Sequence, residues 1–253
     1  MAQTIGDLLA RYACPPAPPQ PTRRERNAAL LYADLLKECG TAVDVELDES
    51  IHDSPSVIGR MKGRKPGPTI QLAGHIDHID VPHEKPARAG ETISGRGSAD
   101  MKAGLACILE IVRLLAAETR GFPGQVLVTV YGLHEAPLGK SEGLMGLIGR
   151  KVTGDAALVM ECPTVAGQAK AIVCGKGQSI WTLTIEREGD ASHELRRAPE
   201  ADGLIDAAAA VVQALRAEDR ELSAVSHDLL GPESLFIGQV HYEKLGSHSI
   251  LDR

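Results

Sequence analysis

Apolar and polar residues alternate in several short stretches of the chain, and each such stretch predicts a β-strand. In the clearest one, Ile70 and Leu72 alternate with Thr69 and Gln71 before Gly74 ends the run. Longer stretches with apolar residues three and four positions apart predict helices. This pattern predicts strands over 43–47, 57–61, 69–74, 125–133, 155–160, 180–185 and 235–242, helices over 26–39, 102–119, 144–151 and 201–216, and a loop over 81–94.

The order of these elements predicts an α/β fold. Strands joined through helices form a mostly parallel sheet flanked by those helices, and the carboxyl ends of its strands meet at one edge. Ligands bind at that edge in proteins of this class. Polar residues that follow these strands are therefore the first candidates for a functional site.

Several strands end in a histidine or a carboxylate. One histidine with several carboxylates is the ligand set of a zinc, manganese or cobalt site. Any one of these residues alone is ordinary for a surface loop, but their joint occurrence favours a metal site. The candidates are His75 and Asp77 after 69–74, His134 and Glu135 after 125–133, and Glu161 after 155–160.

Asp100 is a further candidate because it follows a glycine-rich bend and precedes the helix predicted over 102–119. An aspartate at this position often caps the helix. The other interpretation is a metal-binding carboxylate held at the same edge as the strand ends. The spacing alone leaves both open.

Composition narrows the class of protein. The chain has 253 residues and a net charge of -7, which argues against a nucleic-acid-binding surface. No apolar run is long enough to span a bilayer, and the N-terminal residues do not resemble a secretory signal. The five cysteines are scattered without a CxxC pair. We therefore expect a reduced, cytoplasmic protein that binds neither nucleic acid nor membrane.

Three motifs resemble those of the M20 family of metallopeptidases and amidohydrolases, which includes carboxypeptidases, aminoacylases, acetylornithine deacetylases and succinyl-diaminopimelate desuccinylases. Residues 74–77 resemble the family's G-H-x-D, and residues 95–102 resemble its G-R-G-x-x-D-x-K. Residues 161–164 resemble its E-P-T, with Cys162 inserted.

The resemblance implies a site for two divalent metal ions, zinc first, with cobalt or manganese as alternatives. His75, Asp100 and Glu161 would bind one ion. Asp100, Glu135 and a distant histidine would bind the other, with Asp100 shared between them. Asp77 would lie behind His75 and hold it.

The strand end at 134–135 departs from the family, which has paired glutamates there, a general base followed by a metal ligand. Here the pair is His134 and Glu135. Either Glu135 is the ligand and His134 takes the place of the base, or Glu135 is the base and one ligand is lost, because Ala136 cannot replace it. We favour the first. A P-loop ending in Gly139-Lys140-Ser141 is not supported, because its first glycine would have to occupy position 134.

The resemblance also implies two domains: a catalytic domain over 1–175 and part of a smaller α+β lid or dimerisation domain over 176–253. Residues 189–193 resemble the family's G-x-x-x-H, so His193 would stabilise the oxyanion. The chain ends at Arg253 inside the small domain, and the segment carrying the last metal-binding histidine is absent. We therefore expect a fragment, a chain completed by a partner, or a chain without hydrolase activity.

The leading hypothesis from the resemblance is a hydrolase of amide bonds in N-acyl amino acids or short peptides, acting through a metal-bound hydroxide. The protein would be a homodimer. The alternative is a catalytically inactive or incomplete relative that acts as a binding or assembly protein. Metal content and amide hydrolysis distinguish the two.

Overall fold

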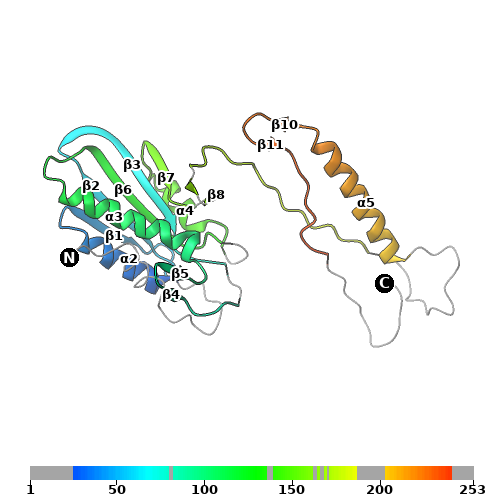
Figure 1. Ribbon diagram of the computed structural model, residues 1–253, viewed down its shortest axis with the longest axis horizontal. Helices are drawn as coiled ribbons and strands as arrows, with labels where there is room; N and C mark the ends of the chain where they lie inside the picture. The colour runs from blue at the N-terminus through cyan, green and yellow to red at the C-terminus, as the bar shows by residue number, and fades with distance from the viewer. Residues whose placement is uncertain are drawn as a thin grey trace. The chain divides into compact units, whose positions relative to one another are not determined.

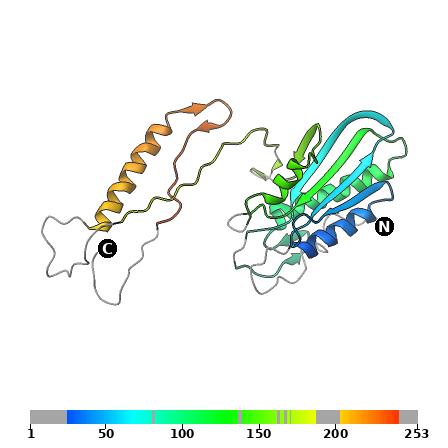
Figure 2. The same cartoon turned by 180° about the vertical axis from the view of Figure 1, so that it is seen from behind.

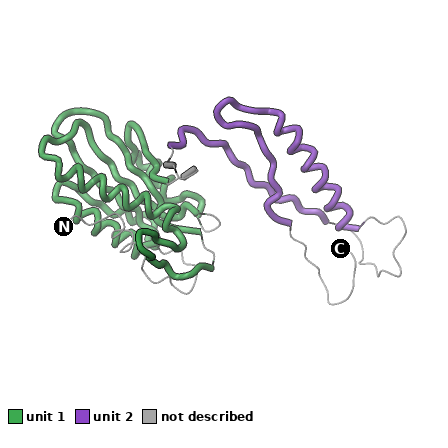
Figure 3. The backbone as a smooth tube through the Cα atoms, in the orientation of Figure 1, with its two compact units in different colours: residues 1–170 green, residues 171–253 purple. Residues whose placement is uncertain are grey.

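The computed structural model describes residues 25–79, 82–135, 139–161, 164–165, 168–169, 171–186 and 203–240. The chain divides into two compact units, residues 1–170 and residues 171–253 (Figure 3). In the part of the chain that is described, no helix has both the length and the apolar character needed to cross a membrane.

The first unit is built on a five-stranded sheet in the order β1-β2-β6-β3-β7 (Figure 1). Strand β3 pairs in parallel with both β6 and β7, whereas β1–β2 and β2–β6 are antiparallel. The predicted α/β class is confirmed, with a mixed sheet. The short connection between β1 and β2 forces an antiparallel pair, because parallel neighbours need a long crossover. The strands are β1 (Val43–Asp48), β2 (Ser56–Lys62), β3 (Lys65–His75), β6 (Pro123–Tyr131) and β7 (Ala156–Val159).

Helices cover both faces of this sheet. Helices α2 (Arg26–Glu38) and α3 (Ala103–Ala117) lie on one face, and α4 (Glu142–Gly149) lies on the other (Figures 1 and 2). The alternation along the strands explains this arrangement, since successive side chains point to opposite faces. Val57 joins the core under α2 and α3, whereas its neighbour Ile58 packs in the cluster that includes Leu147 of α4.

Three small elements complete the first unit. Strands β4 (Ala87–Ala89) and β5 (Thr92–Ser94) form a hairpin, so the prediction of a loop over 81–94 was wrong for these residues. A second two-stranded hairpin joins β8 (Thr164–Val165) to β9 (Gln168–Ala169). The irregular helical turn η1 (Ser98–Lys102) leads directly into α3.

The second unit contains the helix α5 (Leu204–Leu222), which confirms and extends the helix predicted over 201–216. It also contains the short pair β10 (Ser226–His227) and β11 (Gly231–Pro232). The strands predicted over 180–185 and 235–242 were wrong for residues 180–185 and 235–240, which lie outside any strand. Their apolar side chains are exposed, for example Trp181 at 84% and Phe236 at 89%. Alternation alone does not make a strand without a neighbour to pair with.

Candidate metal centre

His75 is the last residue of β3 and lies at the carboxyl edge of the parallel half of the sheet. Its side chain is only 1% exposed, and its backbone N–H donates to the sulfur of Met101 at 3.1 Å. A side chain on Gly74 would come within 2.5 Å of the Met101 methyl group. The turn η1 therefore packs directly on the end of β3, which brings Asp100 next to His75.

Three carboxylates from three separate segments surround the His75 imidazole. Its Nε2 lies 3.0 Å from Oδ1 of Asp100 and 3.4 Å from Oε1 of Glu161. It lies 4.0 Å from Oε1 of Glu135. These carboxylates come from η1, from the end of β7 and from the end of β6. The structure thus brings together all four residues that the resemblance implied as metal ligands.

Asp100 does not cap α3. The residue at the N-cap is Lys102, and no side-chain capping hydrogen bond forms there. Asp100 has φ -110° and ψ 99°, which is not helical, and its carboxylate contacts His75 instead. Of the two interpretations of Asp100, its position therefore favours the metal-binding carboxylate.

Asp77 connects the ends of two strands through its two oxygens. Its Oδ1 lies 3.4 Å from Nδ1 of His75, and its Oδ2 accepts hydrogen bonds from the backbone N–H groups of His134 and Glu135, each at 2.8 Å. Burial raises the pKa of Asp77, but the contacts with His75 and with the backbone N–H of Glu135 outweigh it and lower the pKa overall. Asp77 therefore stays ionised and holds the two strand ends together.

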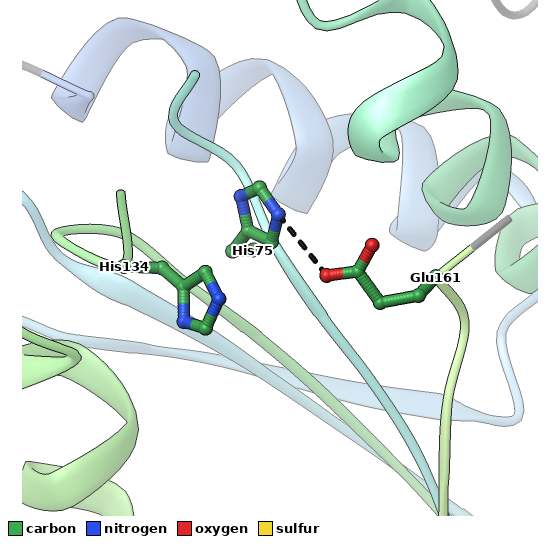
Figure 4. Close-up of side chains that lie close together, drawn as sticks. All are labelled: His75, His134 and Glu161. Atoms are coloured by element: carbon green, nitrogen blue, oxygen red, sulfur yellow. Dashed lines mark ion pairs between the residues drawn. The ribbon is translucent and has the colours of Figure 1, made fainter. Parts of the chain in front are cut away.

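His134 lies against His75 with the two rings almost parallel. The ring centroids are 4.5 Å apart and the planes differ by 22°. Figure 4 shows both rings beside Glu161, whose carboxylate forms an ion pair with His75. The structure also places Nδ1 of His134 at 3.3 Å from Oγ of Ser141, at the start of α4.

Among the residues that the structure describes, two groups of three have ligand atoms within 4.8 Å of one another. One group is His75, Asp100 and Glu135, and the other is His75, His134 and Glu161. Sequence reasoning considered His134 only as a base and did not consider it as a candidate ligand. Its position directly after a strand, beside a carboxylate, was the signal that could have indicated this role.

The charges in this region fit a divalent cation. Burial and then the Asp100 carboxylate raise the pKa of Glu135. Burial lowers the pKa of His75, but Asp77, Glu161 and Asp100 outweigh it and raise the pKa overall. Neighbouring carboxylates repel the ionised form of Glu135 and attract the protonated form of His75. A cation bound among these oxygen and nitrogen donors would relieve that repulsion.

Lys102 supplies positive charge from beneath the site. Its side chain is 7% exposed, and burial lowers its pKa to about 8 against the opposing effect of Asp77, Asp100 and Glu135. A Cβ atom on Gly97 would lie 2.6 Å from the Lys102 Nζ. Gly97 also has a positive φ of 76°, a backbone conformation that favours glycine, whereas the end of the flexible Lys102 side chain could shift to make room for a Cβ atom.

Gly104 brings α3 close to the segment that carries Glu161. A Cβ atom on Gly104 would lie 1.8 Å from the backbone carbonyl oxygen of Met160. The Met160 N–H in turn donates to the carbonyl oxygen of Ala73 at 2.9 Å. The residue before Glu161 is thus fixed between α3 and β3, and this contact helps to hold Glu161 near His75.

A pocket of about 400 Å³ adjoins the carboxylates. Asp100 and Glu135 line one part of its wall. Lys85 and Arg96 contribute positive charge elsewhere in the wall, which His78 and His83 also line. The pocket is large enough for a small molecule that reaches the carboxylates. His193, the candidate for oxyanion stabilisation, lies outside the described residues.

Residues 71–232 match the sequence model of a family described as peptidase family M20/M25/M40. This match spans more than half of the chain and includes all of the residues in the metal centre. The chain therefore belongs to the M20/M25/M40 peptidase family.

Two curated relatives match part of the chain. A Bacillus subtilis (strain 168) N-formyl-4-amino-5-aminomethyl-2-methylpyrimidine deformylase is 30% identical over 123 residues, which are 45% of this chain and 28% of the relative. A succinyl-diaminopimelate desuccinylase from Methylobacterium radiotolerans is 32% identical over 130 residues, 47% of this chain and 32% of the relative. The matched part of the chain thus covers about a third of the length of these relatives.

Solved structures of similar proteins include a Bacillus cereus aminopeptidase, PepT, and a dinuclear metal binding peptidase of the M20 family from Bacillus subtilis, YXEP. The first has a TM-score of 0.45 and 21% identity, covering 60% of this chain and 41% of that chain. The second has a TM-score of 0.43 and 17% identity, covering 58% and 40%. The family assignment rests on the sequence match rather than on these likenesses.

Proposed function

We propose that this protein is a metal-dependent hydrolase of amide bonds in N-acyl amino acids or short peptides. The observation that carries the proposal is the convergence of His75, Asp100, Glu135 and Glu161, from four separate segments, at one edge of the sheet. Such a set of donors has no role in the core packing, and it leaves carboxylates crowded together unless a cation is bound.

Two divalent metal ions would occupy this site. His75, Asp100 and Glu161 would hold one, and Asp100 and Glu135 would hold the other, with Asp100 shared. Bound ions would polarise the carbonyl of the amide and lower the pKa of a water molecule. Zinc is the first choice, and cobalt or manganese are alternatives, because sites of nitrogen and oxygen donors accept all three.

The remaining residues have positioning and proton-transfer roles. Asp77 keeps the His75 ring in place and fixes the backbone at 134–135. His134 or Glu135 accepts the proton from the attacking water and returns it to the leaving amine. His193 would stabilise the developing oxyanion, a role taken from the family motif alone.

The pocket beside Asp100 and Glu135 would receive the substrate. Arg96 and Lys85 in its wall complement the free carboxylate of an acyl amino acid or peptide. The names of the two curated relatives, a deformylase and a desuccinylase, support removal of an acyl group.

We assign the catalytic function to residues 1–175 and a lid or dimerisation function to residues 176–253. The protein would act on small molecules as a homodimer in the cytoplasm, without nucleic acid or membrane. Size measurement in solution tests the dimer separately from the metal site.

The first test is the metal-to-protein ratio of the full chain, by elemental analysis after loading with zinc and desalting. We expect bound metal in the wild type and loss of about one equivalent or more in His75→Ala, because His75 lies at the centre of both ligand groups. A screen of acyl amino acids then tests hydrolysis. His52→Ala is the matched control, since His52 is exposed in a turn and belongs to neither ligand group.

A folded wild-type chain that binds no metal would overturn the hydrolase proposal. The binding or assembly alternative would then stand, supported by the loss of one of the family's paired glutamates, since the pair here is His134 and Glu135. Metal binding without hydrolysis of any acyl amino acid or peptide would instead reject the proposed reaction while keeping the metal site.

A further inference from the structure

We infer that His134 is a metal ligand, acting with His75 and Glu161, and is not the general base. This inference rests on the proposed function, because it concerns the same metal site. It assigns to position 134 a role different from the base that the sequence motif implied. The base role then passes to Glu135, as in the second of the two alternatives that the sequence left open, and Glu135 no longer counts as a ligand of the ion that Asp100 holds.

The first argument is the geometry of the donors. Ligand atoms of His134, His75 and Glu161 all lie within 4.8 Å of one another. The two imidazoles are nearly parallel at 4.5 Å, so neither ring blocks the other from the same cation (Figure 4). Two imidazoles with one carboxylate are an established ligand set for zinc.

The second argument is the orientation of the His134 ring. Its Nδ1 lies 3.3 Å from Oγ of Ser141. With the proton on Nδ1 donated to this hydroxyl, Nε2 is the nitrogen that carries the free lone pair. Histidines that bind metal usually donate their other N–H to a protein group in this way, which fixes both the tautomer and the ring.

The third argument is that the backbone holds both partners of this hydrogen bond. The His134 N–H donates to Asp77, and the Ser141 N–H donates to the carbonyl oxygen of Leu133 at 2.7 Å. A Cβ atom on Gly139 would lie 2.2 Å from the Leu133 carbonyl carbon, so the two ends of this loop approach closely. A rigid support of this kind suits a ligand that must keep a fixed position.

The test measures metal affinity without relying on catalysis. Zinc is titrated into the full chain in competition with a chromophoric chelator, for the wild type, His134→Ala, Ser141→Ala and His52→Ala. We expect His134→Ala to weaken the binding of one zinc equivalent by at least about 100-fold, because loss of a partner behind a ligand already costs about 10- to 100-fold in affinity. Ser141→Ala should weaken the binding by about 10-fold. His52→Ala removes an exposed histidine outside both ligand groups and outside the pocket wall, and it should leave zinc affinity within about twofold of the wild type.

A second readout reports on the ligands themselves. Cobalt replaces zinc, and its visible spectrum should change in His134→Ala but not in His52→Ala. His134→Glu offers a carboxylate in place of the imidazole, so it should recover most of the affinity. If His134→Ala does not fold, the same comparison is made with His134→Gln, which fills more of the space of the ring.

The outcomes separate this inference from the function on which it rests. Normal zinc affinity and an unchanged cobalt spectrum in His134→Ala, with zinc lost in His75→Ala, would overturn the ligand role and return His134 to the base. A wild-type chain without zinc would overturn the proposed function and this inference together. Weakened zinc in His134→Ala alone would support the inference even if no substrate is found.

Discussion

Helices α2 and α5 have equally strong amphipathic patterns but very different environments. In α2 the apolar face is buried against the sheet and α3, whereas no residue of α5 is buried. The same contrast applies to the strands. Apolar residues of β3 and β6 form the core of the first unit, while Ile180 and Trp181 in the second unit are more than four-fifths exposed. An apolar pattern therefore indicates a surface that can pack, and folding depends on whether a partner surface is present.

The largest effect that tests this comparison comes from two matched truncations in helices. Leu109→Ala in α3 should destabilise the first unit by about 2–5 kcal/mol, because Leu109 is 1% exposed in the core. Ile205→Ala in α5 should change stability by less than about 0.5 kcal/mol, since Ile205 is 64% exposed. Urea unfolding followed by circular dichroism measures both. Equal costs for the two variants would mean that α5 packs as tightly as α3.

A second pair of variants compares glycines in the two units. Gly104→Ala should cost about 1–3 kcal/mol, because its Cβ would overlap the Met160 carbonyl oxygen. A Cβ atom on Gly175 would meet no atom within 4 Å, so Gly175→Ala should not measurably change the free energy of unfolding. Gly104→Ala should also weaken zinc binding, since Glu161 follows Met160 directly. A stable Gly104→Ala variant with normal zinc affinity would show that this contact does not position Glu161.

The smallest expected effect is a pH dependence confined to the first unit. The pKa of Asp77 is lower in the folded state than its ordinary value near 4, so its ionised form stabilises the fold above about pH 4. This contribution disappears as the pH falls through the lowered pKa. With a chelator present, Asp77→Asn should therefore lower the free energy of unfolding at pH 6 by about 1 kcal/mol. It should also reduce the fall of that free energy below pH 4. Asp44→Asn, at an exposed strand position, is the control. The same fall in the free energy of unfolding below pH 4 in both variants would contradict this role of Asp77.

Much of the first unit could be predicted from sequence because local pattern and tertiary packing agree there. The ends of β3, β6 and β7 were expected to carry the chemistry, and they meet at one edge as parallel neighbours must. The hairpin β4–β5 was missed because proline and glycine dominate its surroundings. The strands expected in the second unit were wrong because alternation does not reveal whether a pairing strand exists.

The details of the metal centre were less accessible to sequence reasoning. The motif indicated Asp100, but only the structure distinguishes a capping aspartate from one that contacts His75. The close approach of Gly104 to Met160 depends on backbone distances between elements that are far apart in the chain. The reach of His134 toward Glu161 depends in the same way on tertiary placement, so the pattern after β6 suggested only a base at position 134.

The two hydrogen bonds that Asp77 accepts have a consequence for how this site can change over evolution. Asp77 contacts the main-chain N–H groups at positions 134 and 135, and these two hydrogen bonds do not involve the side chains there. Different residues can therefore be exchanged at these two positions while the backbone that presents them stays in place. A histidine–glutamate pair can occupy a scaffold that suits two glutamates, and new chemistry can arise there through single substitutions without first rebuilding the fold.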